Sequence, residues 1–581
     1  MILTLINWLY VTATVGIIGI GFLTLLNKVT GYECKEIDIY LFTGIAFVTA
    51  YAEIFSLFYK VGGLANIVLL LICFLTAVVC RKQIRDLAAV LYKKVILIKQ
   101  EKWSKSKTAH CVFVIAVFIL FWLIACQRAY HADTDLYHAQ SIRWLEEYGI
   151  VKGLGNLHHR FAYNSAFMPL QALYSWAFLI NQSMHVMNAY LCMLITLYAL
   201  IKCSCEKGNY KASYCFALVI LVYDVMNMGT MASPGTDHFA LLFLLYIISK
   251  WCDYIEKREK TTEAYGILCI LALYALTVKL SVAMIMILTI KPALEMLKKK
   301  RYQTIGFMIA SGLFLLLPYC IRNFIISGYF VYPVVATGFL DVDWKMIPYS
   351  VDFDKKEITA YARGIYDKTR YNEVWDMPIT GWFSTWWQTK ALWLKMMLVS
   401  HIVFLPVFLV LNIIKIIKNR VPYDIVLNVM VLAQFLYWLL SAPLSRYGSI
   451  VLFLLPCMTL IHLLENKQKI VIKCYQKAMP VLLAVLMIAL TYQTVICIEK
   501  IPLKRSSYYV YRECNEIEWE GIMVYGPIEN AYTGYYQFPG ITCVNRLPYM
   551  ELRGNTLKDG FRIKEEYKQV KLTPGGTIIE Q

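Results

Sequence analysis

Long apolar stretches recur along most of the chain, and they restrict its fold more than any other feature of the sequence. An apolar helix of roughly 17 to 25 residues can cross a lipid bilayer. Only helices and closed barrels can do so without leaving backbone N–H and C=O groups unpaired in lipid. Of the 581 residues, 59% are hydrophobic and 17% are charged, which is more apolar than a soluble domain. The sequence therefore predicts a polytopic α-helical membrane protein.

The apolar stretches predict about 14 transmembrane helices when each is given a length that can span a bilayer. They lie near residues 2–26, 39–58, 64–80, 111–126, 184–201, 214–229, 238–254, 264–278, 280–296, 305–319, 391–411, 423–440, 449–464 and 479–498. The segment from Ala166 to Ile180 is also apolar, but it contains Pro169 and is too short for a comfortable span. We expect it to lie in the membrane interface or to re-enter the helix bundle.

The charged residues between these helices are distributed unevenly. Residues 81–107 contain nine Lys or Arg and two acidic residues. Three long segments are neutral: 128–182 has 4 basic and 4 acidic residues, 321–390 has 8 of each, and 499–581 has 11 of each. Because cytoplasmic loops are enriched in Lys and Arg, this pattern places 81–107 in the cytoplasm and the neutral segments outside. Topology then explains the formal charge of +18, so we expect no nucleic-acid partner.

The expected organisation has three parts. Residues 1–110 form a module of three spans followed by the basic cytoplasmic loop. Residues 111–498 form the main transmembrane module, which carries the outer loops 128–182 and 321–390. Residues 499–581 form a small extracytoplasmic cap, and β-favouring residues between turn signals predict an α+β fold for it.

Polar and charged residues gather at the predicted outer boundary of the membrane. The first outer loop begins HADTDLYH and contains Asp133, Asp135, His138 and Arg160. Further polar residues lie at or near the outer ends of later spans: Asp224, Asp237, His238, Lys279, Arg322, Asn323, Arg446 and Tyr447. An ionisable residue at membrane depth loses hydration at a high cost in free energy, so each of these is a candidate functional residue.

Glycosyl transfer from a lipid phosphate requires this combination of charges. A carboxylate must take the proton of the acceptor hydroxyl, and cations must stabilise the phosphate that leaves. Asp133 or Asp135 could be the base, and Lys279, Arg322 and Arg446 could bind the donor phosphate. The expected supporting residues are His138, Asp237, His238, Asn323, Tyr447 and Arg160. No cofactor is certain, although a divalent metal could bind the carboxylates together with His131 and His138.

Several of these residues also have simpler explanations. Loop carboxylates are often solvated, and Arg322 and Arg446 could extend to lipid headgroups. His158 and His159 are expected to be hydrogen-bonding loop residues rather than metal ligands. Four tryptophans precede the span at 391–411 and are expected first as an aromatic belt and second as a sugar or lipid platform: Trp375, Trp382, Trp386 and Trp387.

The 17 cysteines include no pair with the spacing of a zinc site. Most lie within or beside the expected spans, where buried thiols act as small apolar residues. Cys514 and Cys543 differ because both lie in the outer cap. They could form a disulfide there.

Five motifs together resemble the bacterial members of the GT-C superfamily of membrane glycosyltransferases. They are HADTDLYH (131–138), SPGTDH (233–238), TVKLS (277–281), IRNFIISGYFVYP (321–333) and SAPLSRYG (441–448). The resemblance covers residues 110–465. It implies an inverting transfer from a polyprenyl-phosphate-linked sugar at the outer face of the bacterial cytoplasmic membrane, with a loop aspartate as general base.

The chain departs from the pattern of that superfamily in two ways. Three expected spans precede the first outer loop, whereas the superfamily commonly carries its catalytic aspartate after the first span. Asp133 and Asp135 are separated by Thr134 rather than adjacent. This spacing leaves the identity of the base open between the two carboxylates.

The expected function is that of an integral-membrane glycosyltransferase with a cell-envelope glycan or glycolipid as acceptor. Its partners would be the lipid-linked sugar, the acceptor and the membrane lipids. A polysaccharide polymerase or ligase is an alternative, which would depend on outer arginines such as Arg322. A lipid-linked glycan transporter or flippase is a second alternative. Transporters tend to have internal repeats and polar sites at the middle of the bilayer, whereas these polar residues lie at its predicted outer boundary.

Overall fold

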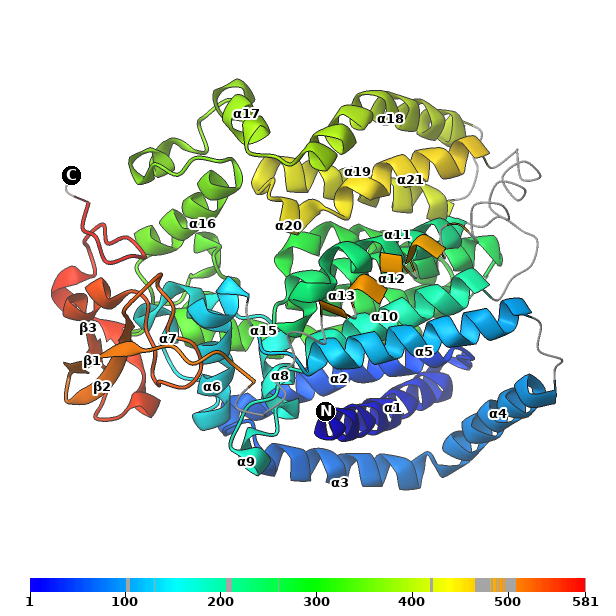
Figure 1. The fold of residues 1–581 in the computed structure, drawn as a ribbon, viewed down its shortest axis with the longest axis horizontal. Coiled ribbons are helices and arrows are strands. Elements are labelled where there is room, and N and C mark those ends of the chain that lie inside the picture. The colour runs from blue at the N-terminus through cyan, green and yellow to red at the C-terminus, as the bar shows by residue number, and fades with distance from the viewer. Residues whose placement is uncertain are drawn as a thin grey trace.

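The computed structural model describes residues 1–100, 105–129, 131–204, 212–259, 261–417, 422–464 and 508–579, together with short pieces between 481 and 496. Figure 1 shows that these residues form two parts. Long helices lie side by side in a bundle, and short helices with four strands gather at one end of it. We call this second part the lobe, and it is built from residues of the segments 128–182, 321–390 and 508–579.

Ten helices of the described residues are long and apolar enough to cross a membrane, and one bent pair could supply another span. The ten are α1 (Ile2–Thr30), α2 (Ile37–Phe58), α5 (Lys105–Ala125), α11 (Ala212–Asn227), α12 (Asp237–Glu256), η4 with α14 (Leu280–Lys298), α15 (Tyr302–Ser327), α18 (Leu392–Ile417), α19 (Pro422–Ser441) and α20 with α21 (Ser445–Leu464). The shorter apolar helices α10 (Met187–Ser204) and α13 (Thr262–Val278) pack among them. The chain is therefore a helical membrane protein, as the sequence predicts.

The expected spans and the observed helices agree in position more closely than in number. Every expected span up to residue 464 coincides with a helix. Three of these helices are not among the ten because they are at the short end of the length that can cross a membrane, namely α3 (Gly63–Val79), α10 and α13. The last expected span, residues 479–498, lies largely outside the described residues.

The helices of the bundle differ in how far they are buried. In α12, 89% of the most apolar stretch is buried inside the protein, whereas in α18 the buried share is 11%. Both helices are mostly apolar, so their apolar content alone does not predict this difference in burial. Their packing explains the difference in burial, because α12 lies at the centre of the bundle and α18 at its edge, where lipid would cover it (Figure 1).

Residues 81–107, which we expected to be a loop, are mostly helical. Helix α4 (Arg81–Gln100) follows α3 directly and bends away from it by 83°. The next helix, α5, begins at Lys105. The sequence of α4 is amphipathic, with apolar residues such as Ile84, Leu87 and Leu91 at intervals of three and four. The number of basic residues predicts on which side of the membrane residues 81–107 lie, but it does not predict their secondary structure.

The C-terminal tail contains two small antiparallel sheets. Strand β1 (Cys514–Trp519) pairs with β2 (Ile522–Pro527), and β3 (Met550–Leu552) pairs with β4 (Phe561–Ile563). Gly521 lies in the turn between β1 and β2, and residues 522–525 belong to β2. The helical turns within residues 508–579 are all short 3₁₀ segments. The structure therefore confirms the strands of the expected α+β fold, but these residues contain no α-helix.

The possible disulfide between Cys514 and Cys543 is not formed. Both thiols are free in the structure. The Sγ of Cys514 lies 3.8 Å from the carbonyl oxygens of Arg512 and Thr533, whereas the Sγ of Cys543 lies 3.8 Å from a ring nitrogen of His159. The two sulfurs therefore have different neighbours within the lobe.

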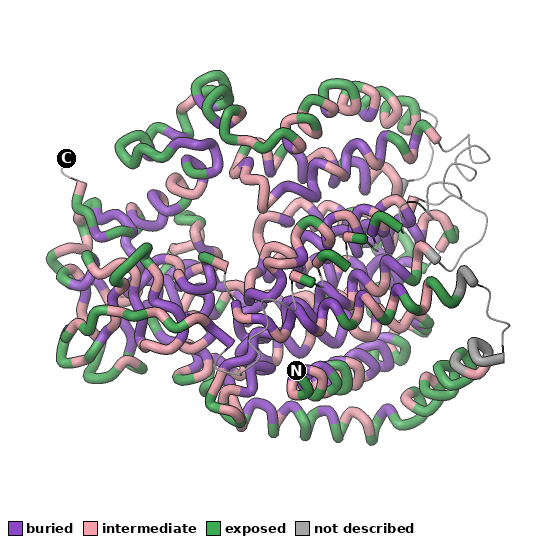
Figure 2. The backbone as a smooth tube through the Cα atoms, in the orientation of Figure 1, coloured by how far each residue is buried: buried purple, intermediate pink, exposed green. Residues whose placement is uncertain are grey.

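Three segments that are distant in sequence share one hydrophobic core in the lobe. Its buried residues include Trp144 and Leu154 from the first segment, Met346 from the second, and Val524 and Phe561 from the tail. Figure 2 shows buried backbone continuing from the bundle through the middle of the lobe. The tail therefore packs into the lobe as part of its core.

The short apolar segment after the first loop folds back into the protein. It forms α8 (Phe167–Tyr174), in which every residue is buried, and α9 (Ala177–Ile180). The chain breaks between them at Trp176, whose φ is 53°. Helix α8 packs against α2 and against α6 (Ala139–Glu147). Re-entry into the bundle fits the burial of α8, whereas α9 has no buried residue and carries the exposed Phe178 and Leu179.

The four tryptophans before α18 do not form a single surface belt. Trp382 and Trp386 lie in α17 (Ile379–Gln388), with 2% and 0% of their surface exposed. They pack against α16 (Pro348–Ala362) and α19 in a separate hydrophobic cluster. Trp375 is 40% exposed. The belt prediction is therefore wrong for Trp382 and Trp386, which fill a core instead.

Candidate functional site

The first outer loop is anchored where it leaves α5. The backbone N–H of His131 donates a hydrogen bond to Ser233 Oγ (3.1 Å), and the backbone N–H of Asp133 donates one to His131 Nδ1 (3.2 Å). Ser233 belongs to the SPGTDH turn and is itself held by Asn188, whose Nδ2 donates to its carbonyl oxygen (2.9 Å). Two of the motifs identified in the sequence therefore meet at His131, two residues before Asp133.

Asp133 forms an ion pair with Arg446. Arg446 lies in the short helix α20, and its Nη1 is 2.7 Å from Asp133 Oδ2. Its Nη2 donates to the hydroxyl of Tyr447 (3.0 Å). Burial raises the pKa of Asp133, but Arg446 and the other positively charged groups around it together lower that pKa to about 2. Asp133 is therefore ionised at neutral pH.

A second carboxylate and a second cation complete this group. Asp237 begins α12, and Lys279 follows the last residue of α13. Lys279 Nζ forms an ion pair with Asp237 Oδ1 and lies 4.5 Å from the centre of the Tyr447 ring. Arg446 Nε lies 3.8 Å from Asp237 Oδ2. We call these five residues, Asp133, Asp237, Lys279, Arg446 and Tyr447, the Asp133 cluster.

Asp135 faces in a different direction. Its Oδ2 accepts hydrogen bonds from Arg512 Nε (2.9 Å) and Nη2 (2.5 Å), and its side chain is buried. Its backbone carbonyl accepts hydrogen bonds from the N–H groups of Thr533 (3.1 Å) and Gly534 (2.9 Å). Burial raises the pKa of Asp135, although its hydrogen bonds with Arg512 oppose this shift. The structure therefore connects Asp135 to the tail.

The separation of the two carboxylates follows from their spacing. Residues 134–138 form one turn of π-helix that continues into α6. Side chains two positions apart on a helical turn point to roughly opposite sides. Asp133 and Asp135 therefore face the bundle and the tail respectively, and they are not arranged to share a metal ion. Among the described residues, the two groups with the spacing of metal ligands consist of other side chains.

His138, His238 and Arg160 surround the Asp133 cluster. His138 is 4% exposed, and burial lowers its pKa to about 3, so its ring is neutral at physiological pH. Both ring nitrogens of His238 are hydrogen-bonded, to Tyr223 (2.8 Å) and to Thr230 (2.6 Å). The positive charge of Arg160 acts on Asp133, and its guanidinium lies 5.9 Å from the centre of the Tyr137 ring.

Arg322 and Asn323 lie in a different environment. Arg322 is 3% exposed and donates hydrogen bonds to Asn164 Oδ1 (3.1 Å) and to Ser56 Oγ. Its charge also interacts with that of Glu53 in α2. Asn323 Nδ2 donates to the carbonyl oxygen of Tyr319 (3.1 Å). These contacts hold the Arg322 guanidinium inside the protein, away from the Asp133 cluster.

The remaining expected site residue, Asp224, is buried in α11. Its Oδ2 accepts a hydrogen bond from Thr196 (2.6 Å). The structure thus brings together Asp133, Asp237, Lys279, Arg446 and Tyr447, with His138, His238 and Arg160 nearby. Asp135, Asp224, Arg322 and Asn323 have other partners.

The sequence did not single out Arg512. It lies in a neutral segment with 11 basic and 11 acidic residues, and its neighbours form no motif. It contacts Asp135 across a separation of 377 residues. A signal for this contact exists only in the tertiary structure.

Comparison with known proteins gives one match. The profile of a family described as Domain of unknown function (DUF8201) matches residues 1–453. No curated protein and no solved structure matches the chain. The matched range contains the whole Asp133 cluster, whereas Arg512 and the rest of the tail lie beyond it.

Proposed function

We propose a function for this chain, which belongs to the DUF8201 family, from the chemistry of the Asp133 cluster. The chain is an integral-membrane glycosyltransferase of the GT-C type. It moves a sugar from a polyprenyl-phosphate-linked donor to a cell-envelope glycan or glycolipid at the outer face of the bacterial cytoplasmic membrane. The observation that carries this proposal is the contact of the Asp133 carboxylate with Arg446, beside Lys279, where the loop meets the bundle.

In the proposed reaction an acceptor hydroxyl oxygen attacks the anomeric carbon of the donor sugar. The bond from that carbon to the phosphate oxygen breaks, and the phosphate oxygen keeps the electron pair. Asp133 takes the proton of the hydroxyl as general base. A single displacement of this kind inverts the configuration at the anomeric carbon. In this proposal Arg446 and Lys279, which pair with Asp133 and Asp237, bind the phosphate and stabilise its increased negative charge as it leaves.

The ion pair with Arg446 also affects the strength of the base. A carboxylate with a pKa of about 2 is a weak proton acceptor. When a donor phosphate binds Arg446, it shares the positive charge that lowers the pKa of Asp133. The carboxylate then becomes more basic. Asp133 would therefore act as a base mainly after the donor has bound.

Asp133 has better support than Asp135 as the base. Asp133 is 9% exposed and faces two cations, whereas Asp135 is 1% exposed and is held by Arg512. Arg322 loses support as a phosphate ligand because its guanidinium contacts Ser56 and Asn164. A general base must reach the proton that it removes, and this favours Asp133.

The proposed topology has 14 spans with the lobe outside the cell. The basic helix α4 and the lobe lie at opposite ends of the bundle in Figure 1, which supports this orientation. The N-terminus lies at the end near the lobe, because Trp122 Nε1 in α5 donates to the carbonyl oxygen of Met1 (3.0 Å). These positions agree with an external N-terminus and an external lobe.

The Asp133→Asn variant tests the proposal. We expect it to consume a polyprenyl-phosphate-linked sugar at least about 100-fold more slowly than the wild type, because loss of a general base has effects of this size. The assay incubates purified protein in detergent with a panel of such donors and an acceptor glycolipid, and measures the donor that remains. The exposed Asp341, also in an outer segment, supplies a matched control, and Asp341→Asn should keep full activity.

Two results would contradict the proposal. Asp133→Asn with near-normal turnover would exclude Asp133 as the base, and a wild type that consumes no donor would exclude the reaction. If the Asp133→Asn variant keeps its activity and a folded Arg322→Ala variant loses it, a polymerase or ligase would be favoured.

A further inference from the structure

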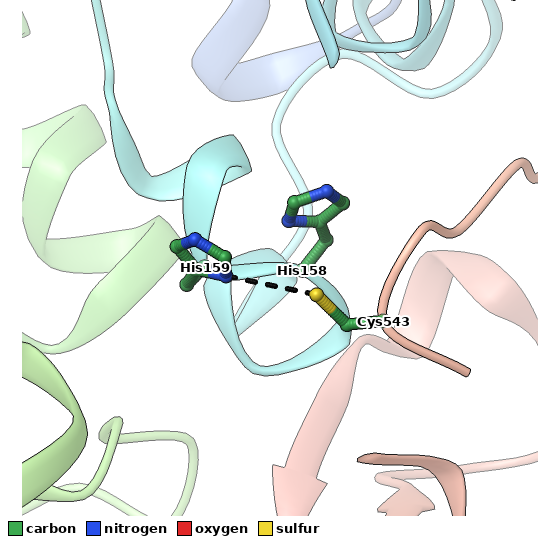
Figure 3. A group of neighbouring side chains, drawn as sticks. All are labelled: His158, His159 and Cys543. Carbon is green, nitrogen blue, oxygen red and sulfur yellow. Dashed lines mark hydrogen bonds between the residues drawn. The ribbon is translucent and has the colours of Figure 1, made fainter. Parts of the chain in front are cut away.

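Two adjacent histidines of the first outer loop meet a cysteine of the tail inside the lobe. Figure 3 shows the side chains of His158, His159 and Cys543 converging from these two segments. One ligand atom from each of the three lies within 4.8 Å of the other two. His158 and His159 are buried, and Cys543 is partly buried. Cys543 lies 384 positions after His159 in the sequence, so only the fold brings the cysteine to the two histidines.

The distances are close to those of ligands around one metal ion. His159 Nδ1 and Cys543 Sγ are 3.8 Å apart. In a tetrahedral zinc site, bonds of about 2.0 to 2.3 Å place neighbouring nitrogen and sulfur ligands about 3.5 Å apart. A shift of a few tenths of an ångström would therefore suffice for these two atoms.

His159 is oriented by a carboxylate on its other side. Its Nε2 lies 3.5 Å from Asp354 Oδ1. Asp354 Oδ2 accepts hydrogen bonds from the hydroxyls of Tyr163 (2.5 Å) and Tyr332 (2.8 Å). A carboxylate that accepts the second N–H of a histidine is the usual outer partner of a metal-bound imidazole, because it sets the tautomer and the ring orientation. Nδ1 of His159 is then left to face Cys543.

His158 must exchange a hydrogen bond in order to bind a metal. Its Nδ1 accepts from the backbone N–H of Arg160 (3.1 Å), and its Nε2 is paired with Thr542 Oγ1. A metal ion would replace one of these partners. Burial lowers the pKa of both His158 and His159 well below the usual value, so both rings are neutral and each keeps a lone pair.

We propose that His158, His159 and Cys543 form a zinc site that joins the first outer loop to the tail. One thiolate and two imidazoles are ligands that Zn²⁺ prefers. A second group of ligand type, His159 with Asp354 and Glu357, shares His159 but offers oxygen in place of sulfur. In the zinc assignment Asp354 is the outer partner of His159. This site uses none of the residues of the proposed glycosyl transfer.

Metal binding at this site is coupled to the protonation of Cys543. The Cys543 thiol loses its proton when the Zn²⁺–thiolate bond forms. Binding should be weaker at lower pH for this reason.

Metal content of the purified full chain tests the zinc site. The protein in detergent is dialysed against Zn²⁺ and then against metal-free buffer, and zinc is measured by mass spectrometry. We expect about one Zn²⁺ per chain in the wild type and in Cys514→Ser, and a loss of this zinc in Cys543→Ser. Cys514 is the matched control because it is a free thiol of the same tail with other neighbours. Asp354→Asn should weaken zinc binding about 10-fold to 100-fold.

Cobalt supplies a measurement that does not depend on a variant. Co²⁺ bound by a thiolate gives an intense near-ultraviolet charge-transfer band, and we expect this band in the wild type. Absence of the band, or equal zinc in the wild type and Cys543→Ser, would overturn the proposal. Retention of Cu²⁺ without retention of Zn²⁺ would also overturn the zinc assignment.

Discussion

At the scale of single residues, two carboxylates two positions apart have different surroundings. Asp133 contacts Arg446 of the bundle, and Asp135 contacts Arg512 of the tail. The helical turn that carries them directs their side chains to opposite sides. The sequence identified both as candidate bases and left the choice open. Their different partners now favour a chemical role for Asp133 and a structural role for Asp135.

Acidification should weaken the ion pair between Asp133 and Arg446. The pKa of Asp133 is about 2 in the folded protein, below its ordinary value of 3.8. A carboxyl group with a lowered folded pKa stabilises the fold above its unfolded pKa, and this stabilisation is lost as the pH falls through the folded pKa. A shift of this size corresponds to about 2 kcal/mol.

Thermal unfolding in detergent measures this effect. We expect the Tm of the wild type to fall between about pH 4 and pH 2, and more steeply than the Tm of Arg446→Gln, in which the ion pair is absent. The variant should also be less stable than the wild type at neutral pH, because it leaves a largely buried carboxylate without its cation. Identical pH dependence in the two proteins would contradict this account.

At the scale of elements, small residues decide how closely α1 and α2 approach. A Cβ atom at Gly19 of α1 would overlap the carbonyl oxygen of Tyr40 in α2, and one at Gly44 of α2 would overlap that of Val15 in α1. Glycine at these contacts lets the two backbones touch, as in many pairs of membrane helices. The apolar sequence predicts both helices, but it does not predict which of their glycines lie at the contact.

Replacement of glycine in α1 should have opposite effects at two positions. Gly19→Ala should destabilise the protein by about 1 to 3 kcal/mol, because the added methyl group must separate α1 from α2. Gly16→Ala should be neutral or slightly stabilising, because a Cβ there has no neighbour within 4 Å and alanine favours a helix. Thermal unfolding of the two variants compares them directly, and an equal loss of Tm in both would show that close packing at Gly19 is unimportant.

At the scale of the whole molecule, the tail completes the lobe. Gln140 Nε2 donates hydrogen bonds to the carbonyl oxygens of Gly534 (2.9 Å) and Gln537 (2.8 Å). Arg143 donates to the carbonyl oxygens of Tyr535 (2.8 Å) and Tyr536 (2.6 Å). The loop that carries Asp133 is therefore held by the bundle on one side and by the tail on the other. The proposed zinc site would add a further connection between loop and tail.

Loss of Arg512 should loosen the tail from this loop. Arg512→Ala leaves the buried carboxylate of Asp135 without its cation, and we expect a cost of about 1 to 3 kcal/mol because Arg512 itself is partly exposed. Limited proteolysis should then cut the tail faster than in the wild type. The double variant Arg512→Ala with Asp135→Asn should recover part of the stability, since no uncompensated charge is left. A double variant no better than Arg512→Ala alone would contradict this explanation.

The sequence by itself determined the class of the protein and the positions of most helices. An apolar helix needs no partner to satisfy its backbone in lipid, so its composition is enough to predict it. The sequence also selected Asp133, Asp237, Lys279, Arg446 and Tyr447, because charged and polar groups at membrane depth are rare unless they interact.

Only the tertiary structure decided how those residues are combined. It assigned Asp133 to Arg446 and Asp135 to Arg512, directed Arg322 into the packed bundle, and brought Cys543 to His158 and His159. These contacts join residues that lie far apart in the chain. The sequence around each residue does not predict which residue it contacts. Such pairs depend on the packing of the hydrophobic core in the lobe, which no single segment contains.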